Sequence, residues 1–206
     1  MHPHQKDIDM LMAAFARTGQ QMTEALEQDL LASIEILEFE KEETVLRQND
    51  VCEYVYFITE GSLMVTEKIN QKDYPHWFLL KKDFCISPKS FFEQQPSKFA
   101  IVALENTRCI SLTQKLLQEM CLSHQELNNI QKAVIIHYYI ESDENKTHLH
   151  LTAAERIAFL YEKKPHFFDH INDYHLAAYL GMAGPTFSTL KKEVLPKNRS
   201  SDILSF

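Results

Sequence analysis

YVYFITEGSLMVTEKI, residues 54–69, contains two short runs of β-branched, aromatic and aliphatic residues on either side of Gly61. Short runs of this composition are typical of β-strands, and a glycine between two of them predicts a hairpin turn with positive φ. The middle of the chain is therefore predicted to form an antiparallel β-sandwich or β-roll. Similar segments, bounded by Asn, Asp, Gly and Pro, are ETVLRQND (43–50), HWFLLKKD (76–83), KFAIVALENT (98–107) and RCISLTQ (108–114).

The residues before this β-rich region have a helical pattern, from about residue 7 to residue 38. Four apolar residues recur there at three- and four-residue spacing: Leu26, Leu30, Leu31 and Ile34. Thr23 precedes them and is suited to an N-cap. We therefore expect helices throughout this segment.

The longest helical pattern is QELNNIQKAVIIHYYIES, residues 125–142. Leu127, Ile130 and Val134 form one apolar stripe, but nearly every residue from Ala133 to Ile140 is apolar. A helix that is apolar most of the way round must be covered on more than one side. We expect the β-roll to cover one side and a second copy of the chain to cover the other, which predicts a homodimer. Burial entirely within one chain is the alternative.

The C-terminal part predicts further helices. LTAAERIAFLYEKKP (151–165) begins with a capping-box pattern, Thr152 to Glu155, and NDYHLAAYLG (172–181) ends on Gly181, which suits a helix C-terminus. Gly184 and Pro185 then suit the start of another helix. Two short helices joined by three or four residues, with a glycine at the joint, have the spacing of a helix-turn-helix.

The charge is unevenly distributed along the chain. The 206 residues have a formal net charge of −8. Residues 1–150 carry 14 Lys and Arg against 23 Asp and Glu, whereas residues 151–206 carry 7 against 6. The overall charge argues against a protein that coats nucleic acid without specificity, and phosphate repels the C-terminal part least.

The sequence has none of the usual marks of a membrane protein, a metal site or an enzyme. No run approaches the ~20 apolar residues of a membrane span, and the start does not resemble a secretory signal, so we expect a cytoplasmic protein. Cys52, Cys85, Cys109 and Cys121 form no C-x-x-C pair and are expected to be buried or idle thiols. We expect no catalytic residue and no cofactor, because no Ser-His-Asp pattern or Gly-rich phosphate loop is found. We expect no metal site either, because His148 and His150 are expected at the surface.

The order of these parts resembles the Crp/Fnr family of bacterial transcription regulators. In the β-roll the likeness is carried by FEKEETVLRQNDVCEYVYFITEGSLMV (39–65), and in the C-terminal part by LTAAERIAFLYEKKP and LAAYLGMAGPTFSTLKK (176–192). The resemblance implies an α+β fold with three parts. These are N-terminal helices and a cyclic-nucleotide-binding-like β-roll (1–122), a central dimerisation helix and hinge (123–147), and a helix-turn-helix domain (148–206).

The resemblance also implies where a cyclic nucleotide would bind, and there the sequence departs from the family. Ile86 and Ser87 stand at the family's Gly-Glu pair and Ser97 at its phosphate-binding arginine, so we expect cyclic-nucleotide binding to be lost. A phosphate without its guanidinium partner loses charge-assisted bonds worth roughly 1.5–3 kcal/mol each. Lys98 would face the other way unless the alignment is shifted by one residue. Phe91, within SFF (90–92), either lines a pocket for another effector or is an ordinary core aromatic.

The second helix of the motif departs from the family as well. Family members commonly carry a Ser or Thr, a Glu and an Arg where this chain has Ala183, Pro185 and Thr189. An arginine at that position reads guanine, which Thr189 cannot do. The wing after the motif is expected to be reduced or absent, and Lys197 and Arg199 belong either to a phosphate-binding cluster or to a solvated tail. The candidate DNA-binding residues are Thr186, Ser188, Thr189, Lys191 and Lys192.

Two functions follow as hypotheses. The first is a dimeric DNA-binding regulator that does not respond to cyclic nucleotides and whose effector is unknown, with Ser87, Phe91, Ser97 and Lys98 as candidate effector-binding residues. The second is a sensor or protein-interaction module that keeps the fold without specific DNA binding.

Overall fold

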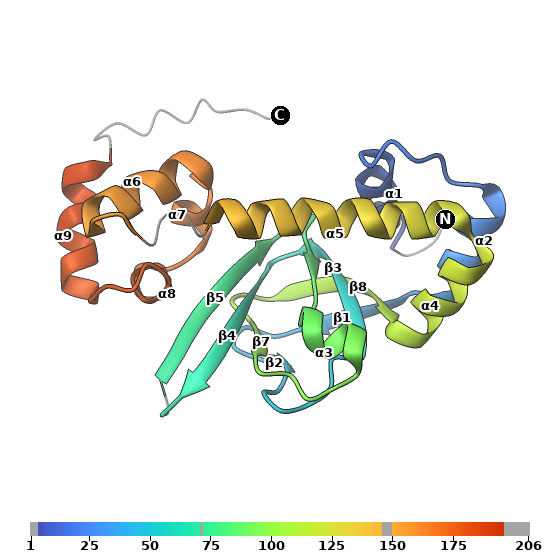
Figure 1. Cartoon of the computed structure of the whole chain (residues 1–206), viewed down its shortest axis with the longest axis horizontal. Helices are drawn as coiled ribbons and strands as arrows, with labels where there is room; N and C mark the ends of the chain where they lie inside the picture. Colours follow the sequence, from blue (N-terminus) through green and yellow to red (C-terminus); the bar gives the residue numbers. More distant parts are fainter. Residues whose placement is uncertain (1–3, 71, 146–149, 196–206) are drawn as a thin grey trace. The chain divides into compact units, whose positions relative to one another are not determined.

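The computed structural model describes residues 4–70, 72–145 and 150–195 (Figure 1). It divides into two compact units, Met1–Glu141 and Ser142–Phe206. Antiparallel sheets in the first unit and helices in the second confirm the predicted mixture of α and β structure. The finer division at residues 122 and 147 stays a prediction. Among the described residues, no helix has both the length and the apolar character needed to span a membrane.

The first unit contains two four-stranded antiparallel sheets, in the strand orders β1-β8-β3-β6 and β2-β7-β4-β5 (Figure 1). The strands are β1 (Glu35–Phe39), β2 (Thr44–Leu46), β3 (Tyr54–Glu60), β4 (Ser62–Ile69), β5 (Lys72–Leu80), β6 (Phe84–Cys85), β7 (Ala100–Ala103) and β8 (Thr107–Thr113).

Strand β3 is buried on both faces, which explains its nearly continuous apolar sequence. Ile58 faces a core inside the roll, together with Leu63 and Ile101 from the second sheet. Phe57 points the opposite way, as neighbouring strand residues must, and enters a second core with Leu30. That second core lies between the first sheet and the helices of the same unit. These are α1 (Gln5–Ala16), α2 (Glu24–Ser33), α4 (Gln114–Ser123) and the first part of α5 (Gln125–Asn145).

The prediction of helix throughout residues 7–38 is wrong at its C-terminal end. Helix α2 begins after Thr23, whose hydroxyl accepts a hydrogen bond from the Leu26 amide, as expected of an N-cap. The chain turns extended at Ile34, and Glu35–Phe39 forms β1 by pairing with β8. Pairing with β8 makes this segment a strand. Local periodicity could not predict this, because β8 lies about seventy residues away in sequence.

The prediction about Gly61 is right on conformation and wrong on topology. Its φ is +84°, but β3 and β4 belong to different sheets and form no hairpin. The glycine instead allows the close approach of a neighbouring turn. A Cβ here would lie 2.5 Å from both the carbonyl oxygen of Asn106 and the hydroxyl of Thr107.

The long helix is confirmed as α5. Val134 packs into the second core of the first unit, and Tyr138 packs against the core of the roll. Ile135, Ile136, Tyr139 and Ile140 remain 43–69% exposed in the single chain. The single chain therefore does not bury all the apolar residues of α5.

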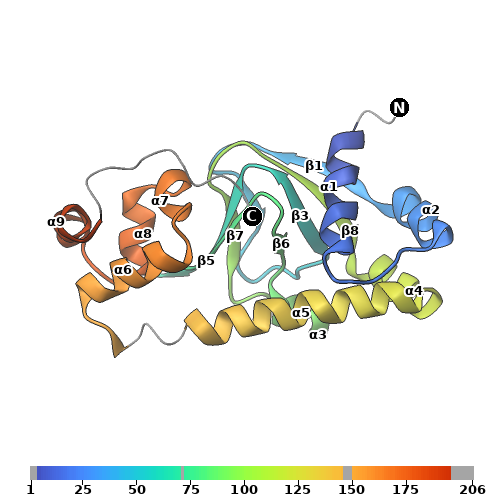
Figure 2. The same cartoon turned by 90° about the horizontal axis from the view of Figure 1, so that it is seen from above.

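The second unit is helical (Figure 2). Thr152 and Glu155 form the predicted capping box. The helices of this unit pack around a core that contains Ile157, Leu176 and Phe187. The helices besides the end of α5 are α6 (Ala153–Lys163), α7 (Phe167–His170), α8 (Asp173–Tyr179) and α9 (Gly184–Val194).

Candidate functional site

The β6–β7 segment, residues 86–99, contains the residues expected at an effector site. It includes the short helix α3 (Pro88–Glu93), which ends at Gln94 in the left-handed conformation with φ 52°. The backbone around Ser97 is fixed by the loop that precedes β3. The Ser97 amide donates to the Asp50 carbonyl, and the Asn49 amide donates to the Ser97 carbonyl, each at 2.8 Å.

Ser87 and Ser97 meet inside the protein. Their hydroxyl oxygens lie 2.8 Å apart, and each residue is only 2% exposed. The Ser97 hydroxyl also contacts the backbone of Phe99, at 2.7 Å from its carbonyl oxygen and 3.1 Å from its amide. The two hydroxyls therefore satisfy each other and the local backbone, as buried polar groups must.

Cys52 is the common partner of the rest of the segment. Its sulfur accepts from the Ser87 amide at 3.5 Å, and its amide donates to the Ser90 hydroxyl at 2.9 Å. Its carbonyl oxygen accepts from the Gln94 side chain at 3.4 Å. Burial raises the pKa of the Cys52 thiol, so Cys52 acts as a neutral packing and hydrogen-bonding group.

Phe91 belongs to the core of the roll and is almost fully buried, in agreement with the ordinary core interpretation. Its amide donates to the Ser87 carbonyl at 2.8 Å, within α3. The neighbouring Phe92 is exposed. The ionisable side chains of α3, Lys89 and Glu93, are also exposed.

Lys98 does not join the two serines. Its exposed ammonium lies 3.2 Å from the carboxylate of Glu67 on β4, which is mostly buried. His76 on β5 approaches the same carboxylate at 3.5 Å. Glu67 thus already has two cationic or hydrogen-bonding neighbours.

Tyr138 connects α5 to this part of the roll. Its hydroxyl accepts a hydrogen bond of 2.7 Å from the Phe84 amide in β6, the strand that leads into the β6–β7 segment. Its ring also meets Trp77 edge-on. Burial raises the pKa of Tyr138, so the hydroxyl is protonated at neutral pH.

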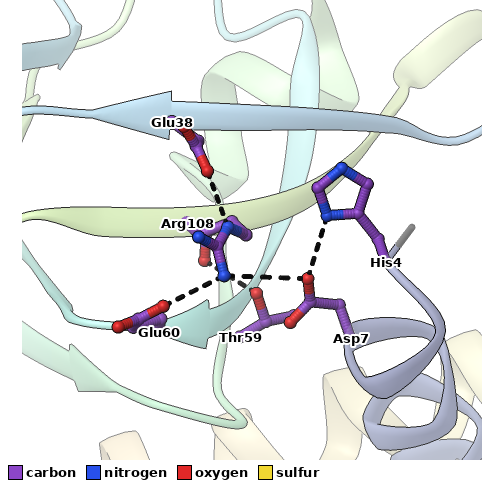
Figure 3. A network of polar contacts seen from close by, with 6 residues as sticks. All are labelled: His4, Asp7, Glu38, Thr59, Glu60 and Arg108. Carbon is purple, nitrogen blue, oxygen red and sulfur yellow. Dashed lines mark hydrogen bonds and ion pairs between the residues drawn. The ribbon is translucent and has the colours of Figure 1, made fainter.

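A second polar cluster surrounds Arg108 on β8 (Figure 3). Its guanidinium lies 2.7 Å from Glu38 on β1 and 3.0 Å from Glu60 on β3, and Asp7 of α1 is 4.0 Å away. The hydrogen bond with Glu38 contributes most to the raised pKa of Arg108. The arginine joins β1, β3 and α1 through its Nε and Nη1 atoms, which pair with three carboxylates. We therefore interpret the cluster as one that stabilises the surface.

In the second unit, α8 and α9 are joined by residues 180–183, with Gly181 at φ +67°. The guanidinium of Arg156 on α6 donates to the Leu180 carbonyl at 2.5 Å, which caps the end of α8. Phe187 of α9 is buried against this group of helices. The two helices therefore form a packed pair with a fixed turn.

The candidate residues of α9 differ in exposure. The side chain of Lys191 is only 24% exposed, and its ammonium lies 2.6 Å from Asp173. The Thr189 hydroxyl donates to the Pro185 carbonyl one turn earlier. Thr186, Ser188, Thr189 and Lys192 are exposed on α9.

The structure thus brings together Ser87, Ser97 and Phe91, and places Lys98 in a different contact. Cys52, Tyr138 and Asp173 could not be identified as contact residues from the sequence, because their partners are distant in sequence and no local pattern indicates them. His148, Lys197, Arg199 and most of the expected wing lie outside the described residues.

Comparison with known proteins supports the interpretation of the first unit. Residues 36–124 match the family model for the cyclic nucleotide-binding domain. A search of the curated proteins found no match.

Several solved structures share the fold. FixK2 from Bradyrhizobium japonicum is 15% identical, covers 78% of this chain and 83% of its own, and has a TM-score of 0.67. The c-di-GMP responsive global regulator CLP from Xanthomonas campestris is 13% identical, with coverages of 83% and 91% and a TM-score of 0.64. A cyclic nucleotide-binding domain containing protein from Listeria monocytogenes is 17% identical, with coverages of 82% and 86% and a TM-score of 0.65. The chain therefore contains a segment that matches the cyclic nucleotide-binding domain, within a fold similar to those of FixK2 and CLP.

Proposed function

We propose that this protein is a dimeric, DNA-binding transcriptional regulator that does not respond to cyclic nucleotides. The observation that carries the ligand part of the proposal is the contact between Ser87 and Ser97. Their hydroxyls satisfy each other at 2.8 Å, at the positions where the sequence departs from the family's nucleotide-binding pattern. A cyclic phosphate would have to break this buried contact and would find no guanidinium in exchange.

The DNA part of the proposal rests on the α8–α9 pair and on the likeness to regulators. In a helix-turn-helix, the second helix enters the major groove with its first residues at the base edges. Thr186, Ser188 and Thr189 would then read bases through short hydroxyl side chains, and Lys192 would contact a phosphate. Such a helix discriminates less strongly between sequences than one with an arginine at residue 189.

The dimer part rests on the exposed apolar face of α5. Ile135, Ile136, Tyr139 and Ile140 would be covered by the same face of a second copy, as a two-fold interface requires. An unidentified effector or partner that prefers one dimer arrangement would then shift the population of DNA-binding states. Ser87, Phe91, Ser97 and Lys98 remain candidates for contacts with such an effector.

Binding to DNA is tested by fluorescence anisotropy on duplexes from an unbiased selection, over a series of salt concentrations. We expect affinity to fall with salt, and Lys192→Ala to make the slope of log K against log salt shallower by about 0.9, the loss of one phosphate contact. Lys163→Ala on α6 is the matched control, because it removes the same charge from a different helix. cAMP, cGMP and c-di-GMP should leave the affinity unchanged. A change of affinity with any of the three would refute the ligand part.

The second candidate is a protein-interaction module without specific DNA binding. It is favoured by the absence of an arginine at residue 189 and by the engagement of Lys191 with Asp173. If the wild-type protein binds no duplex at the lowest salt concentration, this second function is supported over the first.

The dimer is tested by measuring the mass of the protein in solution by light scattering. Ile136→Glu should give a monomer, because it places a charge in the centre of the apolar face. Leu122→Glu is the matched control, since Leu122 is an exposed leucine on α4 rather than on this face. A dimer that survives Ile136→Glu, or a wild-type monomer, would contradict this part of the proposal.

A further inference from the structure

Lys191 of α9 is held by the start of α8. Its ammonium lies 2.6 Å from the Asp173 carboxylate and about equally far from two aromatic rings, 5.8 Å from the centroid of Phe168 and 5.7 Å from that of Phe187. The ion pair is short and charge-assisted, and the side chain is mostly covered. The lysine thus lies across the α8–α9 pair instead of extending into solvent.

The neighbouring Lys192 is exposed and does not take part in this ion pair. The two lysines therefore differ in the free-energy cost of contacting a phosphate. Contact with Lys192 costs only the ordering of its side chain. Contact with Lys191 requires the phosphate to replace the carboxylate of Asp173, and it leaves that carboxylate unpaired beside a polyanion.

We propose that Asp173 sets the DNA affinity of this protein by withholding Lys191 from the phosphate backbone, an inference that rests on the proposed DNA-binding function. The first helix of a helix-turn-helix crosses the DNA backbone, which places residues at its start near phosphates. Asp173, the first residue of α8, is half-exposed there and acts twice. It neutralises a cation of α9, and it repels the phosphates directly.

The simpler interpretation is that the ion pair only holds α8 against α9. The two interpretations predict opposite results for the two partners. If the pair is only structural, removing either residue should weaken DNA binding to a similar extent. If Asp173 withholds the lysine, removing the carboxylate should strengthen binding, and removing the ammonium should not.

The test compares Asp173→Asn with Glu193→Gln in the full chain, using a labelled duplex of mixed sequence between about 50 and 200 mM salt. Both substitutions remove one negative charge, and Glu193 lies exposed on α9 outside the ion pair. A freed lysine adds one phosphate contact and makes the salt slope steeper by about 0.9. The gain in affinity of Asp173→Asn over wild type should therefore be about three- to fourfold larger at the lower salt than at the higher. Glu193→Gln should leave the slope unchanged.

The same comparison in a Lys191→Gln background isolates the role of the lysine. There, Asp173→Asn should no longer make the salt slope steeper. The inference is overturned if Asp173→Asn behaves like Glu193→Gln, or if its steeper slope persists without Lys191. In both cases wild-type binding would leave the proposed function intact. If neither wild type nor Asp173→Asn binds the duplex at the lowest salt, the inference and the proposed function both fail. Binding by Asp173→Asn alone would support the inference but count against DNA binding by the wild-type chain.

Discussion

The hydroxyl oxygens of Ser87 and Ser97 lie 2.8 Å apart although ten residues separate them in sequence. The contact closes the β6–β7 segment on itself. The same segment is tied to Cys52 by three hydrogen bonds, which hold both ends of α3 to the start of β3.

Ser97→Ala should lower the free energy of unfolding by about 1–3 kcal/mol, because it removes a buried hydroxyl and leaves the Phe99 amide and the Ser87 hydroxyl without that partner. Urea denaturation measures the change. Ser123→Ala is the control, since Ser123 is exposed on α4, and its loss should change stability by less than about 0.5 kcal/mol. Equal effects of the two substitutions would contradict this account.

Tyr138→Phe should destabilise the first unit by about 1–2 kcal/mol, because the Phe84 amide loses the hydroxyl that accepts from it. The adjacent Tyr139 provides a matched control. Its side chain is exposed, so Tyr139→Phe should have little effect on the stability of the monomer. Both variants keep the ring. Thermal unfolding compares them in an Ile136→Glu background, which removes the proposed dimer contact of Tyr139. A cost for Tyr139→Phe as large as that for Tyr138→Phe would argue against a special role for the hydrogen bond.

Gly61→Ala should be more damaging than Gly19→Ala. Both glycines have positive φ, which costs a residue with a Cβ about 1–2 kcal/mol. A Cβ at Gly19 meets nothing within 4 Å, whereas one at Gly61 lies 2.5 Å from atoms of Asn106 and Thr107. Overpacking of this kind adds about 1–3 kcal/mol. Denaturation midpoints of the two variants that agree within error would show that the turn relaxes freely.

Stability should fall as the pH rises above 9, because burial raises the pKa of Cys109 from 9.0 to about 12. Below pH 9 the thiol is protonated in both folded and unfolded chains, so its contribution is fully present. Between the two pKa values the unfolded chain releases a proton that the folded chain keeps, and stability declines. The decline from one such thiol is about 1.4 kcal/mol per pH unit.

Cys109→Ala checks this assignment. The variant should lose stability at every pH through the cavity, but its decline between pH 9 and 12 should be shallower than that of wild type. Cys109 also helps to raise the pKa of Cys85 and of Tyr56, so the difference in slope reports Cys109 together with its effect on these two neighbours. Parallel pH profiles would exclude Cys109 as a source of the decline.

Local chemistry made several elements predictable from the sequence. The capping box of Thr152 and Glu155, the N-cap at Thr23 and the positive φ of Gly61 depend on residues within a few positions of each other. The apolar run of α5 predicted cover on more than one side. One side packs against the first unit, whereas Ile135, Ile136, Tyr139 and Ile140 are exposed in the single chain, so cover on the second side stays a prediction. The family resemblance predicted that Ser87 and Ser97 depart from a nucleotide site, and this stays a prediction.

Only the tertiary structure decided which groups meet. Strand β1 forms by pairing with β8, which lies far along the chain, and Gly61 leaves room for the turn at Asn106 and Thr107, where a Cβ would clash. Lys191 and Lys192 are adjacent and identical in chemistry, yet only Lys191 faces Asp173 across the α8–α9 pair. The sequence by itself determined propensities, caps and the residue types available, since these act over a few positions. Partners, burial and charge pairing came from long-range packing, because no local pattern encodes which distant side chain will be 3 Å away.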